Sequence, residues 1–127
     1  MDRSKQTVLL VDDDERALMT IRNLLEDDGF AVLSTADGPH GISLYRDHRP
    51  DLVLLDLGLP TMDGLQVLKE MKLLNPAATV IIITGYASPQ AMSEAVQQGA
   101  HDLLEKPIRP ETLLEKVKSA LSASKQG

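Results

Sequence analysis

Short runs of apolar residues alternate along this chain with longer segments in which apolar residues recur every three or four positions. The runs at 51–56 and 79–84 lack the polar alternation of a half-exposed strand. This is typical of strands that are buried on both faces of a parallel sheet. The run at 8–11 has the same character, and weaker candidates at 31–35 and 102–105 complete the set. The pattern therefore predicts five strands.

The segments between these strands have the spacing of amphipathic helices. Their apolar positions are Leu18, Ile21, Leu24 and Leu25; Ile42 and Leu44; Leu65, Leu68, Met71 and Leu74; Met92, Ala95 and Val96; and Leu113, Leu114, Val117 and Leu121. Residues that favour helix boundaries stand where they are needed, namely Gly29 and Gly99 at ends, Asn75-Pro76 at a stop, and Ser88-Pro89 and Pro110 at starts. Five strand–helix units in this order predict a doubly wound α/β fold with a parallel sheet, right-handed crossovers and helices on both faces.

Length and composition narrow the class of protein further. A chain of 127 residues can bury one substantial core but not two. We therefore expect a single domain over 1–127, with a core at about 7–121 and a polar tail at 122–127 that frays. Acidic residues outnumber basic ones 19 to 13, and the basic residues form no cluster, which argues against direct nucleic-acid binding. The chain has no cysteine, no apolar signal region and no apolar run of membrane length. These features predict a cytoplasmic protein.

Polar side chains stand where the predicted strands end. Asp12 and Asp13 follow the first strand, Asp56 ends the third, Thr84 ends the fourth and Lys106 follows the fifth. Open α/β sheets place their sites outside the carboxyl ends of the strands, at the point where the strand order reverses. If the strands take the order 2-1-3-4-5, which is a common one for such sheets, the reversal brings the three aspartates together.

Three carboxylates in one crevice repel one another, so a positive charge is expected among them. A hard divalent cation such as Mg²⁺ suits carboxylates and a backbone carbonyl and can bridge to phosphate oxygens. Zn²⁺ fits poorly, because no histidine or cysteine is among the candidate ligands. The ion leaves one carboxylate free to attack phosphorus. Lys106 adds a second cation and Thr84 a hydroxyl, and both suit the charge-rich transition state of phosphoryl transfer.

Four motifs in order resemble those of the receiver domains of response regulators in two-component signalling, chemotaxis receivers among them. They are Val11-Asp12-Asp13-Asp14-Glu15, the segment from Asp51 through Asp56 and Pro60 to Asp63-Gly64, Ile83-Thr84-Gly85-Tyr86, and Lys106-Pro107. The resemblance extends from 7 to 121. It implies a flavodoxin-like fold and a phosphorylatable switch that takes a phosphoryl group from a sensor histidine kinase or a phosphotransfer protein.

Carried over position by position, the resemblance also implies roles for single residues. Asp56 is the phosphoacceptor, Asp13 and Asp56 bind Mg²⁺ directly with the backbone carbonyl of Gly58, and Asp12 acts mostly through water. Thr84 and Lys106 contact the phosphoryl group, which is lost again by slow autodephosphorylation. A cis peptide is implied between Lys106 and Pro107.

The family also implies a partner or homodimer surface on the fourth helix, fifth strand and fifth helix, and an effector domain where the parent chain is longer. This sequence departs from the family at Leu103, where an aromatic switch residue is usual. Tyr86 occupies a position that tunes dephosphorylation in the family, and we expect Tyr86 and Gly58 to set the access of water.

Structural explanations compete for most of these residues. Asp12, Asp13 and Asp14 suit the start of a helix, Asp14 in particular. Thr84 and Lys106 are unremarkable at strand ends, and the scattered His40, His48 and His101 are expected at the surface. Asp56 is the hardest to explain as structure, because a carboxylate that closes a wholly apolar strand is costly to desolvate.

Three other functions compete with the switch. A haloacid-dehalogenase-like phosphohydrolase also uses a strand-end aspartate with Mg²⁺, but it needs a second aspartate two residues later, where this chain has Gly58. A degenerate receiver that serves only for docking typically lacks an acidic residue or the lysine, and all are present here. A flavodoxin-like cofactor carrier needs a phosphate-binding loop after the first strand, and none follows it.

Overall fold

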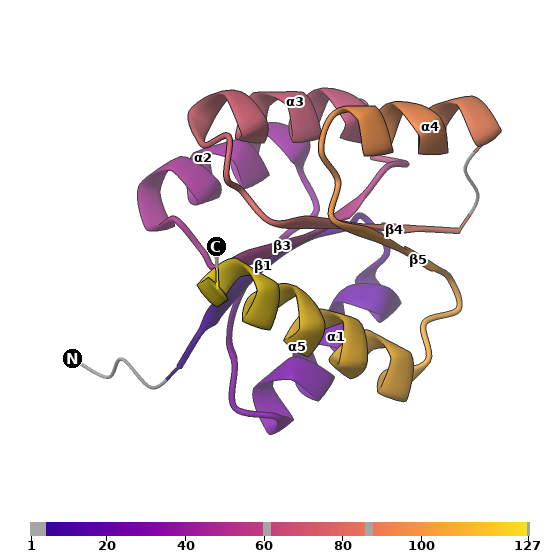
Figure 1. Ribbon diagram of the computed structural model, residues 1–127. Coiled ribbons are helices and arrows are strands. Elements are labelled where there is room, and N and C mark those ends of the chain that lie inside the picture. Colours follow the sequence, from indigo (N-terminus) through magenta and orange to yellow (C-terminus); the bar gives the residue numbers. More distant parts are fainter. Residues whose placement is uncertain (1–4, 60–61, 86–87, 127) are drawn as a thin grey trace.

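Strands and helices alternate throughout the computed structural model, which describes residues 5–59, 62–85 and 88–126 (Figure 1). The elements in chain order are β1 (Thr7–Val11), α1 (Glu15–Asp27), β2 (Ala31–Thr35), α2 (Gly38–His48), β3 (Leu52–Asp56), α3 (Gly64–Leu74), β4 (Val80–Thr84), α4 (Pro89–Gln97), β5 (Asp102–Glu105) and α5 (Pro110–Gln126). The predicted alternation of five strands with five helices is confirmed over these residues.

The strands form one parallel sheet in the order β2-β1-β3-β4-β5. Val8 pairs with Leu52 across β1 and β3, and Asp56 pairs with Ile83 across β3 and β4. The order reverses between β1 and β3, as predicted. The flavodoxin-like, doubly wound α/β fold is therefore confirmed, and it brings the carboxyl ends of β1 and β3 side by side.

Two helical layers enclose this sheet. α1 and α5 cover one face, and α2, α3 and α4 cover the other (Figure 1). Each face has its own apolar cluster, and side chains of β1, β3 and β4 contribute to both. Every residue of β3 and β4 is buried, which explains why these two strands have continuous apolar runs and no polar alternation. Packing relies on aliphatic side chains, because aromatic residues make up only 2% of the chain.

Local sequence accounts for the helix boundaries. The carboxylate of Asp14 accepts hydrogen bonds from the backbone N–H groups of Arg16 and Ala17 and so caps α1, as predicted. Ser88 caps α4 in the same way, with Pro89 as the first helical residue. The chain turns out of α1 at Gly29 and out of α4 at Gly99, where φ is +96° and +95°. Glycine adopts these angles without strain.

The last helix is longer than the sequence suggests. α5 begins at Pro110 as predicted, but it continues to Gln126, into the segment expected to be a frayed tail. Leu113, Val117 and Ala120 recur along its buried face and pack on the same apolar cluster as α1. Despite its length, neither α5 nor any other helix in the described ranges is apolar enough over a sufficient length to cross a membrane.

Candidate functional site

Three aspartates meet at the carboxyl edge of the sheet. Asp12 and Asp13 follow β1, and Asp56 is the last residue of the neighbouring strand β3. One carboxylate oxygen from each residue lies within 4.8 Å of the other two. Asp12 is completely buried and Asp56 is 5% exposed, whereas Asp13 is open to solvent. The structure thus brings together the acidic residues that the sequence singles out.

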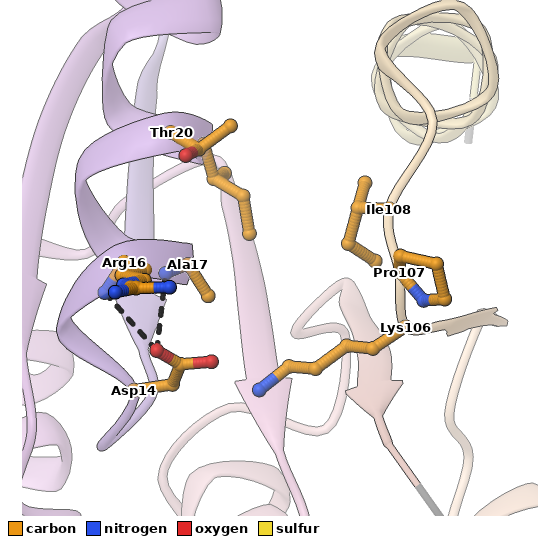
Figure 2. A pocket seen from close by; sticks show the side chains of 8 residues that line it. Asp14, Arg16, Ala17, Thr20, Lys106, Pro107 and Ile108 are labelled. Carbon is orange, nitrogen blue, oxygen red and sulfur yellow. Dashed lines mark hydrogen bonds between the residues drawn. The ribbon is translucent and has the colours of Figure 1, made fainter.

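Lys106 lies between two of these carboxylates. Its Nζ is 3.1 Å from Oδ2 of Asp56 and 3.1 Å and 2.9 Å from the two carboxylate oxygens of Asp12. Its backbone N–H donates to the carbonyl of Thr84 at 2.8 Å, which fixes the start of the β5–α5 connection against β4. Figure 2 shows the side chain reaching from the end of β5 toward α1. The ammonium group of Lys106 therefore lies in the acidic crevice, where the sequence predicts a second cation beside the metal ion.

Burial and the sharing of one cation shift the pKa values of Asp12 and Lys106 in this crevice. Burial, together with the neighbouring Asp56 carboxylate, raises the pKa of Asp12 to about 6, although Lys106 and the N–H of Asp14 act in the opposite direction. Burial also lowers the pKa of Lys106, but its bonds to Asp12 and Asp56 outweigh this and raise the pKa above its ordinary value. Oδ2 of Asp12 is buried and forms an ion pair with Nζ of Lys106 at 2.9 Å, but it accepts no hydrogen bond from the residues that the structure describes.

Asp56 is held at both oxygens and approachable from one side. The backbone N–H of Gly58 donates to its Oδ1 at 2.9 Å, while Oδ2 pairs with Lys106. Gly58 is exposed, and a Cβ built on it would have Asp56 Oδ1, at 3.7 Å, as its single neighbour within 4 Å among the described residues. The lack of a side chain at Gly58 therefore leaves space beside Oδ1 of Asp56.

Thr84 and Leu103 lie on the next two strands. Ile83 is opposite Asp56, so that Thr84, the last residue of β4, is one position beyond the carboxylate and 4% exposed. Leu103 pairs with Ile82 and packs, half-buried, on the apolar cluster beneath α2, α3 and α4. The peptide bond between Lys106 and Pro107 is cis, as the resemblance implies. Pro60 and Tyr86 lie outside the described residues.

The residues at this edge suit a hard divalent cation such as Mg²⁺. The candidate ligands are carboxylate oxygens, and three carboxylates gather here around the single ammonium group of Lys106. His40, His48 and His101 are exposed, as predicted, and none belongs to the cluster. An all-oxygen set of this kind fits Mg²⁺ and fits Zn²⁺ poorly.

A pocket beside the aspartates was not predicted from the sequence. It has a volume of about 510 Å³ and lies between the first turns of α1 and the β5–α5 connection (Figure 2). Ala17, Ile21 and Ile108 line it with apolar surface, and Arg16 and Thr20 stand at the α1 side. Ile21 and Ile108 are indistinguishable in the sequence from core residues, and it is the fold that brings α1 next to the end of β5.

Comparison with known proteins identifies the family. The family described as response regulator receiver domain matches residues 8–118. Chemotaxis protein CheY of Bacillus subtilis is 34% identical over 116 residues, which are 91% of this chain and 97% of that protein. Transcriptional regulatory protein ZraR of Salmonella typhimurium is 36% identical over 126 residues, or 99% of this chain, but the chain spans only 29% of its length.

A solved structure gives the same result. The CheY-like response regulator receiver domain protein of Methanospirillum hungatei superposes with a TM-score of 0.94 at 32% identity, and the match covers 97% of this chain and 98% of that one. The fold and the acidic edge define a doubly wound α/β protein of the signalling class. The chain belongs to the response regulator receiver domain family of two-component systems.

Proposed function

We propose that this receiver domain is a phosphorylatable switch in which Asp56 accepts a phosphoryl group in a Mg²⁺-dependent transfer. The donor is the phosphohistidine of a sensor histidine kinase or phosphotransfer protein, or a small acyl phosphate. The observation that carries the proposal is the environment of Asp56. It is a nearly buried carboxylate at a strand end, held by the Gly58 N–H and by Lys106, and it lies within 4.8 Å of the carboxylates of Asp12 and Asp13.

The chain's own residues supply most of the transfer chemistry. A carboxylate oxygen of Asp56 attacks phosphorus in line, the P–N bond of the phosphohistidine breaks, and the imidazole nitrogen keeps the bonding electron pair. Lys106 already contacts Asp56 at 3.1 Å, so its ammonium can pair with the arriving phosphoryl oxygens. Thr84 brings a hydroxyl from the neighbouring strand that can donate to one of them.

A bound Mg²⁺ would offset the charge of the phosphoryl oxygens. Asp13, Asp56 and the carbonyl of Gly58 would hold the ion, with Asp12 contributing mostly through water. Three carboxylates around one ammonium group, and the pKa of Asp12 raised chiefly by burial, both favour an added cation at this edge. Receiver domains generally bind Mg²⁺ at an acidic pocket, and this chain has such a cluster.

Gly58 favours a switch over a phosphohydrolase. An aspartate two residues after the nucleophile would act as a general acid and base, and Gly58 has no side chain to do so. The acyl phosphate is therefore expected to persist and to be lost by slow autodephosphorylation. Persistence allows the phosphorylated state to be read by a partner.

The readout is a shift between two populations of the α4–β5–α5 surface. Once Asp56 is phosphorylated, Thr84 and the β4–α4 connection move toward the phosphoryl group, and this surface changes its affinity for a partner or for a second copy. Leu103 stands in place of the usual aromatic residue. The movement is therefore transmitted through aliphatic packing on the apolar cluster beneath α2, α3 and α4. ZraR is longer than this chain, which agrees with an effector domain in a longer parent protein.

The pocket between α1 and the β5–α5 connection gives a protein donor a surface to bind next to Asp56. It is apolar inside, and Lys106 borders both the pocket and the acidic crevice. Thr20→Arg would fill it from an exposed position on α1. We expect this variant to accept phosphoryl from acetyl phosphate at the parent rate but more slowly from a phosphorylated histidine kinase found by phosphotransfer profiling. Equal slowing with both donors would contradict a role for the pocket in donor binding.

Intact-mass measurement after incubation with acetyl phosphate and Mg²⁺ tests the proposed function. The parent should gain the mass of one phosphoryl group, and neither the Asp56→Asn variant nor the parent in EDTA should do so. Asp51→Asn is the matched control, because Asp51 lies just before the opposite end of the same strand and accepts a hydrogen bond from Thr7. It should be labelled like the parent. No adduct on the parent, or an equal adduct on Asp56→Asn, would contradict the assignment of Asp56 as the phosphoacceptor.

A further inference from the structure

The first residue of α2 lies unusually close to α3 and to the connection between β3 and α3. Gly38 is buried, and a Cβ built on it would lie 3.0 Å from Cγ2 of Val67, 3.1 Å from Cβ of Met62 and 3.5 Å from Cδ1 of Leu59. The first two distances are tighter than nine in ten contacts of real Cβ atoms, whereas the distance to Leu59 is an ordinary van der Waals contact. α2 can therefore begin in this position because Gly38 has no side chain.

The segment that Gly38 touches includes the neighbour of Gly58. Leu59 follows Gly58 directly, and Met62 lies two positions before the start of α3. On its other side the connection is held by α3, whose first residue Gly64 donates its N–H to the carbonyl of Leu57 at 3.1 Å. The described parts of the connection are thus enclosed between the starts of two helices.

α2 itself is held against the sheet. A Cβ on Gly41, one turn further along the helix, would lie 2.9 Å from Cγ2 of the fully buried Val11 in β1. The carboxylate of Asp37 caps the helix by accepting the N–H of His40 at 2.9 Å. An atom added at Gly38 would therefore press on Val67 of α3 and on Met62 of the connection more than it would move α2.

We infer that Gly38 is a positioning residue for the metal-binding connection. By leaving room for Val67 and Met62, it lets the start of α3 and the connection pack against α2, and the N–H of Gly64 bonds to Leu57 beside Gly58. Gly38 thereby keeps the backbone at Gly58 where its carbonyl can serve as a ligand beside Asp56. This inference rests on the proposed Mg²⁺-dependent function. Mg²⁺ demands nearly ideal octahedral geometry, so displacements of a few tenths of an ångström at one ligand reduce affinity. Changes to residues that support metal ligands typically weaken binding by about 10- to 100-fold.

The test is the Mg²⁺ affinity of Gly38→Ala, measured by isothermal titration with MgCl₂ after removal of metal with EDTA. We expect binding to be weakened by about tenfold. Phosphorylation by acetyl phosphate should be slow at low Mg²⁺ and return to the parent rate at saturating Mg²⁺. A metal-free measurement gives independent evidence, because the hydrogen bond from Gly58 N–H to Asp56 Oδ1 should weaken. Hydrogen exchange of the Gly58 amide in EDTA should then be faster in the variant.

Two further variants separate positioning from loss of stability. Val67→Ala removes the nearest obstacle and should lower the melting temperature without changing Mg²⁺ affinity, and it should restore affinity when combined with Gly38→Ala. Leu59→Ala loosens the same contact from the side of the connection, so it should also weaken Mg²⁺ binding even if Gly38→Ala does not fold. Parent-like Mg²⁺ affinity in both Gly38→Ala and Leu59→Ala would overturn the inference about Gly38 and leave the proposed function standing. Absence of Mg²⁺ binding by the parent would instead overturn the proposed function.

Discussion

The two edges of the sheet hold similar polar residues in opposite ways. At the amino edge, no two of the described carboxylates share a cation: Asp51 accepts the N–H of Thr7 at 2.8 Å, and Asn75 donates to the hydroxyl of Tyr45 at 2.9 Å. Lys72 at this edge donates to the carbonyl of Ala78 at 2.6 Å. These bonds close helix ends and loops. None of them collects like charges in one place.

At the carboxyl edge, three carboxylates gather around one ammonium group. Asp12 and Asp56 share Lys106, and Asp13 completes the cluster. The cost appears in the pKa of Asp12, which is raised to about 6 chiefly by burial. Carboxylates are therefore separated from one another at the amino edge and crowded around one cation at the carboxyl edge. The crowding marks the edge at which a cation and a phosphoryl group would be accommodated.

The largest effect is expected from removing the shared cation. Lys106→Met leaves two buried carboxylates with backbone hydrogen bonds but without their shared cation, which should lower the free energy of unfolding in EDTA at pH 7 by about 3 kcal/mol. Urea unfolding measures this. Mg²⁺ should recover part of the loss. Lys116→Met is the control, because its ion pair with Asp102 is about one-third exposed and should matter by less than about 1 kcal/mol. Equal losses of unfolding free energy in Lys106→Met and Lys116→Met would contradict the distinction between a cation shared by two carboxylates and one paired with a single carboxylate.

A smaller change is expected from replacing Asp12, and it should raise the free energy of unfolding instead of lowering it. Its folded pKa of about 6 lies above the ordinary value of 3.8, so the folded state binds the proton more tightly. The penalty is therefore absent below pH 3.8 and grows to its full value above pH 6. Asp12→Asn should be more stable than the parent by about 2 kcal/mol at pH 7 in EDTA, with no difference near pH 3.8. A parent that is more stable than the variant at pH 7 would show that Lys106 outweighs burial.

The smallest effect is expected at the amino edge. Tyr45→Phe removes the hydroxyl that accepts the hydrogen bond from Asn75, which should cost about 1 kcal/mol of unfolding free energy. Mg²⁺ affinity and labelling by acetyl phosphate should be unchanged, because this bond is at the end of the sheet away from the aspartates. A change in either quantity would mean that the two edges are coupled through α2 and α3.

Features that depend on local sequence were predictable. The runs that became β3 and β4 and the caps at Asp14 and Ser88 depend on residues close together in the chain. The meeting of Asp12 with Asp56 followed once a strand order was assumed. Three-dimensional packing decides the rest. The sharing of Lys106 by two carboxylates and the contact of Gly38 with Met62 join residues far apart in sequence.

The most direct test of the central claim locates the phosphoryl group on the chain. Borohydride reduces an aspartyl phosphate to homoserine, and tandem mass spectrometry then identifies the residue that carried it. After incubation with acetyl phosphate and Mg²⁺, homoserine should be found at position 56, and it should be absent when EDTA replaces Mg²⁺. Homoserine at position 12 or 13, or labelling at 56 that does not depend on Mg²⁺, would contradict the assignment of Asp56 as the metal-assisted phosphoacceptor.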